Sequence, residues 1–338
     1  MWDRRPRLSS LGPGMPGPTQ PGAAVPQGRN GFWSPREAHS RLAQDNPLRG
    51  RSRTAEMGAT PTNSRAAVDE IPDGLWGKCT KCGAMLYQRE LERDLRVCKH
   101  CGFHFRLGAR DRIAITADPD TFVEHDAALA PANPLAFPQY EEKLARDQGK
   151  TGLLDAFIWG ECALAGVPVA MGASDSGFLM ASMGSVLGEK VARAMEFAAA
   201  SRVPLILFSA SGGARMQEGI ISLMQMAKTA AAVHRLGEAR VPYLSVLTDP
   251  TTAGVWASYA SLGDVIAAEP GARVLFAGPR VIEQSLKIKL AGGAHTSEFQ
   301  LEHGMVDLIV PRREMRATLE RLLGYLWSPP AVSGAEPP

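Results

Sequence analysis

Residues 205–219, LILFSASGGARMQEG, combine an apolar run, a glycine pair and the start of a long apolar segment. The run at 205–209 has the length and composition of a buried strand, and residues 218–236 have those of a helix. Glycine is the residue that lets a chain turn sharply between two such elements. The stretch therefore predicts a strand, a tight turn and a helix in direct succession.

The same alternation continues on both sides of this stretch. Short apolar runs predict strands at 167–173, 243–248 and 274–277, and longer Ala- and Met-rich runs predict helices at 188–200, 256–262 and 280–287. Strands that alternate with helices indicate a layered α/β fold, in which strand–strand–helix units recur. Proline-punctuated residues 119–149 are interpreted as a linker with helical pieces. The helix at 218–236 is apolar nearly all round, which predicts burial in the core or at a subunit interface.

The glycine turn has two interpretations. Unpaired N–H groups at a helix start favour negative charge, and glycine lets a ligand approach the backbone. Gly212 and Gly213 are thus candidates for an oxyanion hole, a pair of backbone donors aimed at charge that develops during a reaction. The alternative is an ordinary turn that needs glycine for close packing.

Three other functional motifs are excluded by the sequence. A phosphate loop needs Gly at position 144, which is Leu, and no dinucleotide-binding G-x-G-x-x-G follows a strand. Ser211 lies outside the G-x-S-x-G frame of a serine hydrolase.

A second polar turn, residues 248–255, follows the next predicted strand. Ligands bind in layered α/β folds at the loops that follow strand ends. We expect the two turns to face one site.

Four of the five cysteines form two matching pairs, Cys79-x2-Cys82 and Cys98-x2-Cys101, each followed by a glycine. This spacing predicts a tetrahedral zinc ion with four thiolate ligands, which leaves no open position, so the ion is structural. A redox pair or two disulfides are the alternatives. His100 and His104 are predicted to be exposed bystanders, and Cys162 a small buried apolar residue.

The cysteine module, residues 75–112, is locally basic. Residues 78–112 include nine Lys and Arg residues and four acidic residues. Such a surface attracts phosphates, of nucleic acid or of a cofactor, or is simply a solvated face.

Composition limits the remaining possibilities. The 338 residues carry 37 basic and 35 acidic side chains, so the whole chain lacks the charge of a nucleic-acid binder. No apolar run is long enough to span a bilayer, which predicts no membrane partner and a cytoplasmic location. Residues 1–70, rich in Pro, Gly and Arg, and the tail 327–338 are predicted to be disordered. The N-terminal segment is a dispensable tail, a targeting peptide or the result of an upstream start, with Met57 as an alternative start codon.

Six motifs in a fixed order make a specific resemblance. They are the cysteine module, residues 211–219, the run SLMQMAK at 222–228, TDPTT at 248–252, FAGPRVIEQ at 276–284 and EHGMVD at 302–307. Together they resemble the carboxyltransferase beta subunits of bacterial-type acetyl-CoA carboxylase, over about residues 74–313. The resemblance implies a crotonase-like fold of stacked ββα units over residues 113–326, behind an N-terminal zinc ribbon.

The resemblance also implies the reaction and the partners. The carboxyl group passes from carboxybiotin, on a biotin carrier protein, to acetyl-CoA, and malonyl-CoA forms in the first committed step of fatty acid synthesis. The beta chain acts with a homologous alpha subunit as α2β2, in an ATP-dependent complex with biotin carboxylase. Zinc is bound by the chain, whereas biotin is supplied by the carrier and itself acts as the base.

Site residues follow from the same resemblance. The oxyanion donors map to the backbone of Gly212 and Gly213. Substrate contacts are expected from Ser211, Ala214, Arg215 and Gly254. The sequence departs from the family pattern at Ala253, where glycine is common, at Trp256, where a small residue is usual, and at residues 292–296.

Two alternatives remain open. One is a carboxyltransferase for another acyl-CoA, although such relatives usually lack the zinc ribbon. The other is a zinc-ribbon nucleic-acid binder, as a secondary activity, which would leave the two glycine turns without an explanation.

Overall fold

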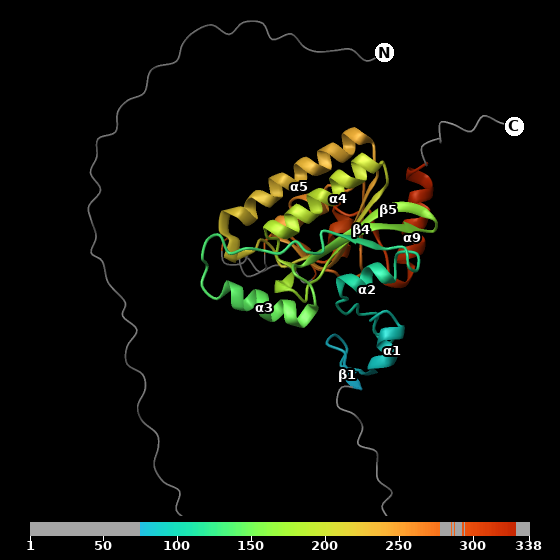
Figure 1. Ribbon diagram of the computed structural model, residues 1–338. Coiled ribbons are helices and arrows are strands. Elements are labelled where there is room, and N and C mark those ends of the chain that lie inside the picture. Colours follow the sequence, from blue (N-terminus) through green and yellow to red (C-terminus); the bar gives the residue numbers. More distant parts are fainter. Residues whose placement is uncertain (1–74, 278–284, 286, 288–292, 294, 329–338) are drawn as a thin grey trace, which may run out of the picture. The chain divides into compact units, whose positions relative to one another are not determined.

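The computed structural model describes residues 75–277, 285, 287, 293 and 295–328 (Figure 1). The predicted disorder of residues 1–70 and the predicted helix at 280–287, apart from two positions, lie outside these residues. The first described segment is a small ribbon. Its strands β1 (Trp76–Lys78) and β2 (Met85–Tyr87) pair antiparallel, and helix α1 (Gln88–Arg93) follows. A core of two cysteines and two leucines holds it together: Cys79, Leu86, Leu91 and Cys98.

The main element is a mixed eight-stranded sheet. Along it the order is β10 (Leu308–Ile309), β8 (Val265–Ala268), β7 (Tyr243–Thr252), β6 (Leu205–Ser211), β5 (Val167–Ser174), β4 (Phe157–Leu164) and β3 (Val123–His125), and β9 (Val274–Leu275) pairs with the end of β7. The pairs β3–β4 and β4–β5 are antiparallel, and the others are parallel. The carboxyl ends of β5, β6 and β7 therefore meet at one edge.

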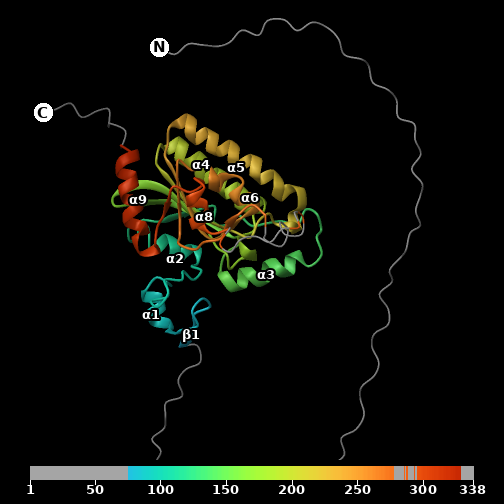
Figure 2. The ribbon, with the colours of Figure 1, turned by 180° about the vertical axis from the view of Figure 1, so that it is seen from behind.

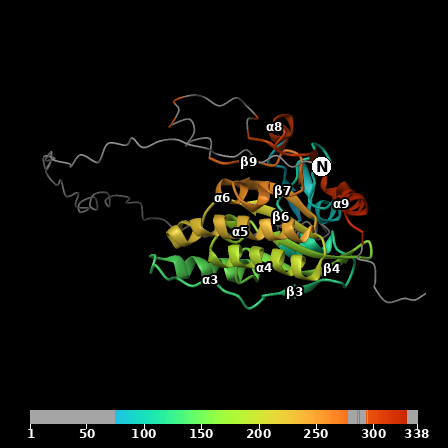
Figure 3. The same ribbon diagram turned by 90° about the horizontal axis from the view of Figure 1, so that it is seen from above.

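Helices cover both faces of this sheet, which buries every residue of β6. Helices α4 (Ser185–Ser201) and α5 (Gly219–Ala239) run side by side over one face (Figures 1 and 3). Helix α2 (Ala109–Ala114) directly follows the ribbon, and it packs with α9 (Arg312–Leu326) against the other face (Figure 2). Successive β6 side chains divide between these two cores: Leu205 and Leu207 face α4 and α5, and Ile206 and Phe208 face α2 and α9.

Shorter elements complete the fold. Helix α3 is Tyr140–Thr151, α6 is Ala253–Trp256 and α8 is Ser297–Glu302; single 3-10 turns occupy Leu179–Ala181, Met216–Glu218 and Tyr259–Ser261. None of the helices in the described ranges is long and apolar enough to cross a membrane.

The predicted α/β class is confirmed, and three details differ. The helix expected at 256–262 is instead split into α6 and a 3-10 turn, since the chain bends at Ser258 (φ −126°, ψ −118°). The segment 119–149 is more than a linker, because β3 extends the sheet and α3 packs beside the turn at 179–181. Helix α5 is buried in the core on one side only, with Ile220, Leu223 and Met224 51–64% exposed, so burial all round in the core is wrong and burial at a subunit interface stays a prediction.

Candidate functional site

The four paired cysteines converge in the ribbon. Their sulfur atoms all lie within 4.8 Å of one another, with 3.7 Å between Cys79 and Cys101 and 3.9 Å between Cys82 and Cys98. A tetrahedral ion with Zn–S bonds of about 2.3 Å needs sulfurs about 3.8 Å apart. The four thiols therefore fit one zinc ion, as the spacing predicts.

The glycine after each pair has a backbone role. Gly83 and Gly102 have φ values of +75° and +68°, which side chains rarely adopt, and each donates its N–H to the first cysteine of its pair. These two turns aim the sulfurs inward. Cys162 is 7% exposed within the sheet core, as predicted, and burial raises the pKa of its thiol to about 12.

One histidine prediction is wrong. His100 is exposed, but His104 is only 9% exposed and its Nδ1 lies 3.6 Å from the Glu269 carboxylate. The difference arises because the ribbon packs against the end of β8, a contact that local spacing does not reveal. His104 is not a zinc ligand in this arrangement.

The glycine turn lies at the carboxyl end of β6, where the sequence predicts it. Gly212 is exposed, and Gly213 has φ +120°. A Cβ at Gly213 would lie 3.1 Å from that of Ala253, so the turn and the start of α6 are in close contact. Thr252 donates its hydroxyl to the carbonyl of Ser211 at 2.9 Å. The two polar turns thus meet, as expected from the strand order.

Both candidate oxyanion donors have internal partners. The N–H of Gly212 donates to the carbonyl of Met180 at 2.7 Å, and that of Gly213 donates to Ser211 Oγ at 3.0 Å. Met180 belongs to three successive residues with left-handed backbones, Leu179 to Ala181, at φ 42–57°. Such conformations cost about 1–3 kcal/mol each and concentrate at functional sites. A substrate oxygen at Gly212 must replace the Met180 carbonyl.

The remaining predicted contacts are placed differently. Ala214 is half-buried beside the turn. Gly254 is a packing position, since a Cβ there would lie 3.2 Å from the Met226 sulfur. Trp256 is 6% exposed and belongs to the core, and Ala253 has φ +50°. Within 292–296, positions 292 and 294 lie outside the described residues, and Thr296 caps α8.

The Arg215 side chain lies in the interior. It is fully buried, and two of its guanidinium nitrogens lie 2.5 and 3.2 Å from the Asp155 carboxylate. It also donates to the Ser182 carbonyl at 2.8 Å. Burial disfavours the charged guanidinium, but the Asp155 carboxylate outweighs it and raises the pKa of Arg215. The arginine fixes the glycine turn against the 182–183 segment.

Asp155→Asn is expected to destabilise the fold by about 3–5 kcal/mol, because it removes the main counter-charge of a buried guanidinium. Glu218 Oε1, 3.4 Å from Arg215, compensates only in part. Denaturant unfolding monitored by far-UV circular dichroism measures the loss. The control is Glu238→Gln, an exposed acid on α5, which should cost under about 1 kcal/mol. An equal, small loss in both variants would remove this role from Arg215.

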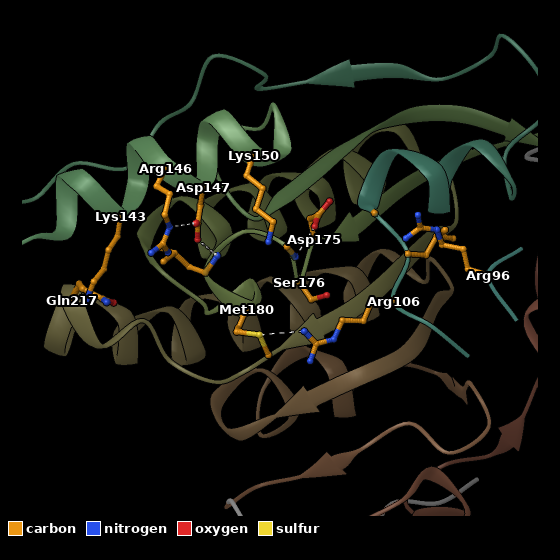
Figure 4. Close-up of a pocket in the computed structure, with 14 residues that line it drawn as sticks. Arg96, Arg106, Lys143, Arg146, Asp147, Lys150, Asp175, Ser176, Met180 and Gln217 are labelled. Atoms are coloured by element: carbon orange, nitrogen blue, oxygen red, sulfur yellow. Dashed lines mark hydrogen bonds and ion pairs between the residues drawn. The ribbon is translucent and has the colours of Figure 1, made fainter. Parts of the chain in front are cut away.

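A cavity of about 870 Å³ opens beside the turn at 179–181 (Figure 4). Arg96 and Arg106 of the ribbon line one part of it, and α3 lines another. Met180 and Gln217 connect it to the glycine turn. Its basic side chains are these: Arg96, Arg106, Lys143, Arg146 and Lys150.

Sequence reasoning missed Asp155, Tyr140 and Glu218, which surround Arg215, and the cationic side chains of α3. Asp155 is 60 residues from Arg215 in the chain, and no local pattern links them. The excess of basic residues in the ribbon sequence was the only signal in the sequence that pointed toward this cavity.

Comparisons with known proteins agree on one family. The carboxyl transferase domain family matches residues 105–306, and the acetyl-CoA carboxylase zinc finger domain family matches residues 76–101. The chain is 58% identical over 254 residues to the acetyl-coenzyme A carboxylase carboxyl transferase subunit beta of Pelotomaculum thermopropionicum, which covers 75% of this chain and 90% of the relative. The corresponding subunit of Desulforudis audaxviator is also 58% identical, over 75% of this chain and 92% of the relative.

Solved structures share the fold. The transcarboxylase 12S structure has a TM-score of 0.58 at 24% identity, and the match covers 64% of this chain and 41% of the other. A Pseudomonas malonate decarboxylase hetero-dimer has a TM-score of 0.52 at 26% identity, over 67% of this chain and 90% of the other.

Proposed function

This chain belongs to the family of acetyl-CoA carboxylase carboxyl transferase beta subunits, and from that premise we propose how its own residues serve the reaction. The enzyme transfers a carboxyl group to acetyl-CoA, with malonyl-CoA as the product, in fatty acid synthesis. The observation that carries this conclusion is the family match together with the four-cysteine centre of the ribbon. The fold is crotonase-like, and zinc has a structural role.

Carboxybiotin, supplied on the carrier protein, provides the carboxyl group. Removal of a proton from the acetyl methyl group places negative charge on the thioester oxygen. We assign the stabilisation of that charge to the backbone N–H groups of Gly212 and Gly213, which follow the carboxyl end of β6. This role requires the Met180 carbonyl to leave Gly212, and the strained backbone of 179–181 favours such a movement.

Arg215 and Ser211 act within the protein rather than on substrate. Arg215 anchors the turn through Asp155, and Ser211 Oγ accepts the Gly213 N–H. Ala214 borders the turn and remains the candidate for direct substrate contact among the four expected residues. Gly254 supports the second turn through its packing against Met226.

The chain is one component of a larger complex, and we assign its partners as an alpha subunit in an α2β2 assembly, the biotin carrier and biotin carboxylase. The exposed apolar side of α5 supports this assignment. Ile220 is 64% exposed and Met224 61%, and neighbouring Met216 is 70% exposed. Exposed apolar patches of this kind mark protein interfaces.

Four free thiols placed to bind zinc favour a reducing compartment, and the location we propose is the cytoplasm.

Malonyl-CoA formation by the purified chain is expected only after the alpha subunit and a carboxylated carrier are added. The reason is that this chain offers one candidate oxyanion turn, at Gly212 and Gly213, and that its sequence contains no Met-Lys-Met biotinylation motif. Product is measured by chromatography from labelled acetyl-CoA. Robust formation by this polypeptide with free carboxybiotin alone would contradict the proposal, as would a complete complex that carboxylates a different acyl-CoA in preference.

Co-elution of the chain with the alpha subunit in size-exclusion chromatography tests the exposed apolar side of α5. Ile220→Glu combined with Met224→Glu should leave the fold intact and abolish co-elution with the alpha subunit. Tyr325→Glu on α9, at an aromatic residue that is 83% exposed, is the control and should assemble normally.

A further inference from the structure

The cavity beside the glycine turn has a charge balance that points to an anionic ligand. Five cationic side chains and two carboxylates line it. Asp147 accepts from Arg146 and from the Leu179 N–H, and Asp175 accepts from the N–H groups of Ala109 and Gly177. Both acids are thus satisfied within the protein. Four cations remain for a ligand: Arg96, Arg106, Lys143 and Lys150.

These four cations have no ion-pair partner among the residues that the structure describes. The Arg106 guanidinium donates to the Met180 sulfur at 3.4 Å, its one side-chain hydrogen bond within the described part of the chain. Figure 4 shows Lys143 and Lys150 extending from α3 and Arg106 approaching from the ribbon side. Cations gathered from separate elements repel one another, and a multiply charged anion between them removes that repulsion.

The two ribbon arginines are positioned by a buried ion-pair cluster of Arg312, Glu269 and Arg112, which we call the latch. Arg312, at the start of α9, donates to the carbonyl of Leu95 at 2.7 Å and to that of Phe105 at 2.9 Å. Each carbonyl immediately precedes one of the two arginines. The two segments that carry them are also joined by a hydrogen bond from the Phe105 N–H to the Arg96 carbonyl, at 2.9 Å.

Glu269 holds Arg312 in this position. Its carboxylate accepts from Arg312 Nε and Nη2, each at 2.8 Å, and from Arg112 at 2.5 Å. All three side chains are at most 4% exposed. Burial favours the neutral acid, but the two guanidinium groups outweigh it and hold the pKa of Glu269 well below its usual range. The latch is therefore charged and rigid at neutral pH.

We propose that this cavity binds the phosphate groups of acetyl-CoA, with Arg96 and Arg106 as ligand-binding residues and Arg312 as a positioning residue. The inference rests on the proposed function. Acetyl-CoA carries phosphates at one end and its reacting thioester at the other. The cavity borders the glycine turn through Met180 and Gln217, so one molecule can occupy both places.

The shape of the site favours CoA over a nucleic acid. Its volume, about 870 Å³, lies within the range of small-molecule pockets, about 300–1,000 Å³. Three other basic side chains between residues 78 and 112 already have ion-pair partners: Lys99 pairs with Glu90, Arg110 with Glu124 and Arg112 with Glu269. An RNA backbone would need a row of cations on an open surface, whereas Arg96, Arg106, Lys143 and Lys150 converge on one cavity.

The test compares two ligands that differ only in the phosphate-bearing end. CoA and pantetheine are titrated calorimetrically into the assembled complex that contains Arg106→Gln, Arg96→Gln or both. Each single change should raise the Kd for CoA about tenfold, or about 1.4 kcal/mol, and leave that for pantetheine unchanged. The control is Lys99→Gln, a ribbon cation paired with Glu90 outside the cavity, which should change neither value.

Arg312→Lys tests the latch, because lysine keeps the charge beside Glu269 but cannot reach both carbonyls. In steady-state kinetics it should raise the KM for acetyl-CoA severalfold, with kcat and zinc content retained and with the KM for S-acetylpantetheine unchanged. A merely structural role would lower kcat for both substrates equally.

Several outcomes would overturn the inference. Equal loss of CoA and pantetheine binding in Arg106→Gln would do so. So would unchanged CoA binding together with weaker retention of the variant on RNA. Calorimetric binding needs no turnover, so a complex that binds CoA through these arginines but makes no malonyl-CoA would refute the proposed function and leave this site standing.

Discussion

Cys98→Ala is expected to release the zinc ion and to unfold the ribbon while the sheet remains folded. A structural zinc site contributes on the order of 10 kcal/mol to local folding. The buried core of the ribbon consists of two cysteines and two leucines with Cys101, Phe103 and Phe105 packed against it, so the metal supplies much of its stability. The loss should stop before α2, because Ala109 and Ile113 pack in the core of the sheet.

Metal analysis and hydrogen exchange measure the two parts of this result. Zinc should fall from one ion per chain to none, and amides of β1, β2 and α1 should exchange rapidly while those of β6 and α4 stay protected. Cys162→Ala is the matched control, since it removes the one thiol outside the cluster and should keep the metal. Wild-type protein purified in reduced form without zinc would refute the site, as would full zinc retention by Cys98→Ala.

The zinc centre could be predicted from sequence because its information is local. Two C-x2-C pairs and their glycines specify the turns that direct the sulfurs, whatever the rest of the chain does. The strands at 167–173 and 205–209 were predictable for a similar reason, since buried parallel strands are continuous apolar runs. Observed β5 and β6 are one and two residues longer, because pairing with neighbouring strands extends them.

The parts that escaped prediction depend on contacts between distant segments. The resemblance implied a substrate contact for Arg215, but its side chain is buried against Asp155, which lies 60 residues away in the sequence. His104 looked exposed because its partner, Glu269, lies at the end of β8. The cavity required α3, the segment after β5 and the ribbon to be placed together, and composition indicated only the basic charge of one of its walls.

Gly213→Val in the reconstituted complex is expected to lower kcat by about 10²–10³, the usual cost of one lost oxyanion donor. The charge develops only in the transition state, so the KM for acetyl-CoA should change less. The structural reason is direct. Gly213 has φ +120°, and its Cβ would lie 3.1 Å from Ala253, so valine must rotate the backbone and turn its N–H away. Steady-state kinetics, corrected for folded fraction by thermal melting, measures the change.

A second glycine variant distinguishes a catalytic role of Gly213 from a role in packing alone. Gly166, in the turn between β4 and β5, also has a left-handed backbone, at φ +77°, and a Cβ at this position would meet no atom within 4 Å. It lies at the opposite end of β5 from the glycine turn. Gly166→Val should therefore reproduce the backbone strain and leave kcat unchanged, whereas a general effect of destabilisation would lower activity in both variants in proportion to folded protein.

The outcome also bears on the Met180 carbonyl, which occupies Gly212 in this structure. The Gly213 N–H donates to Ser211 Oγ, a side-chain oxygen two residues away. If Gly213 is the main oxyanion donor, the substrate oxygen can replace this hydroxyl without any movement of residues 179–181. A Gly213→Val complex that assembles, stays folded and keeps near-normal kcat would place the enolate elsewhere. The next donors to test would then be the N–H groups of residues 252–255, which contact the same turn through Ala253 and Thr252.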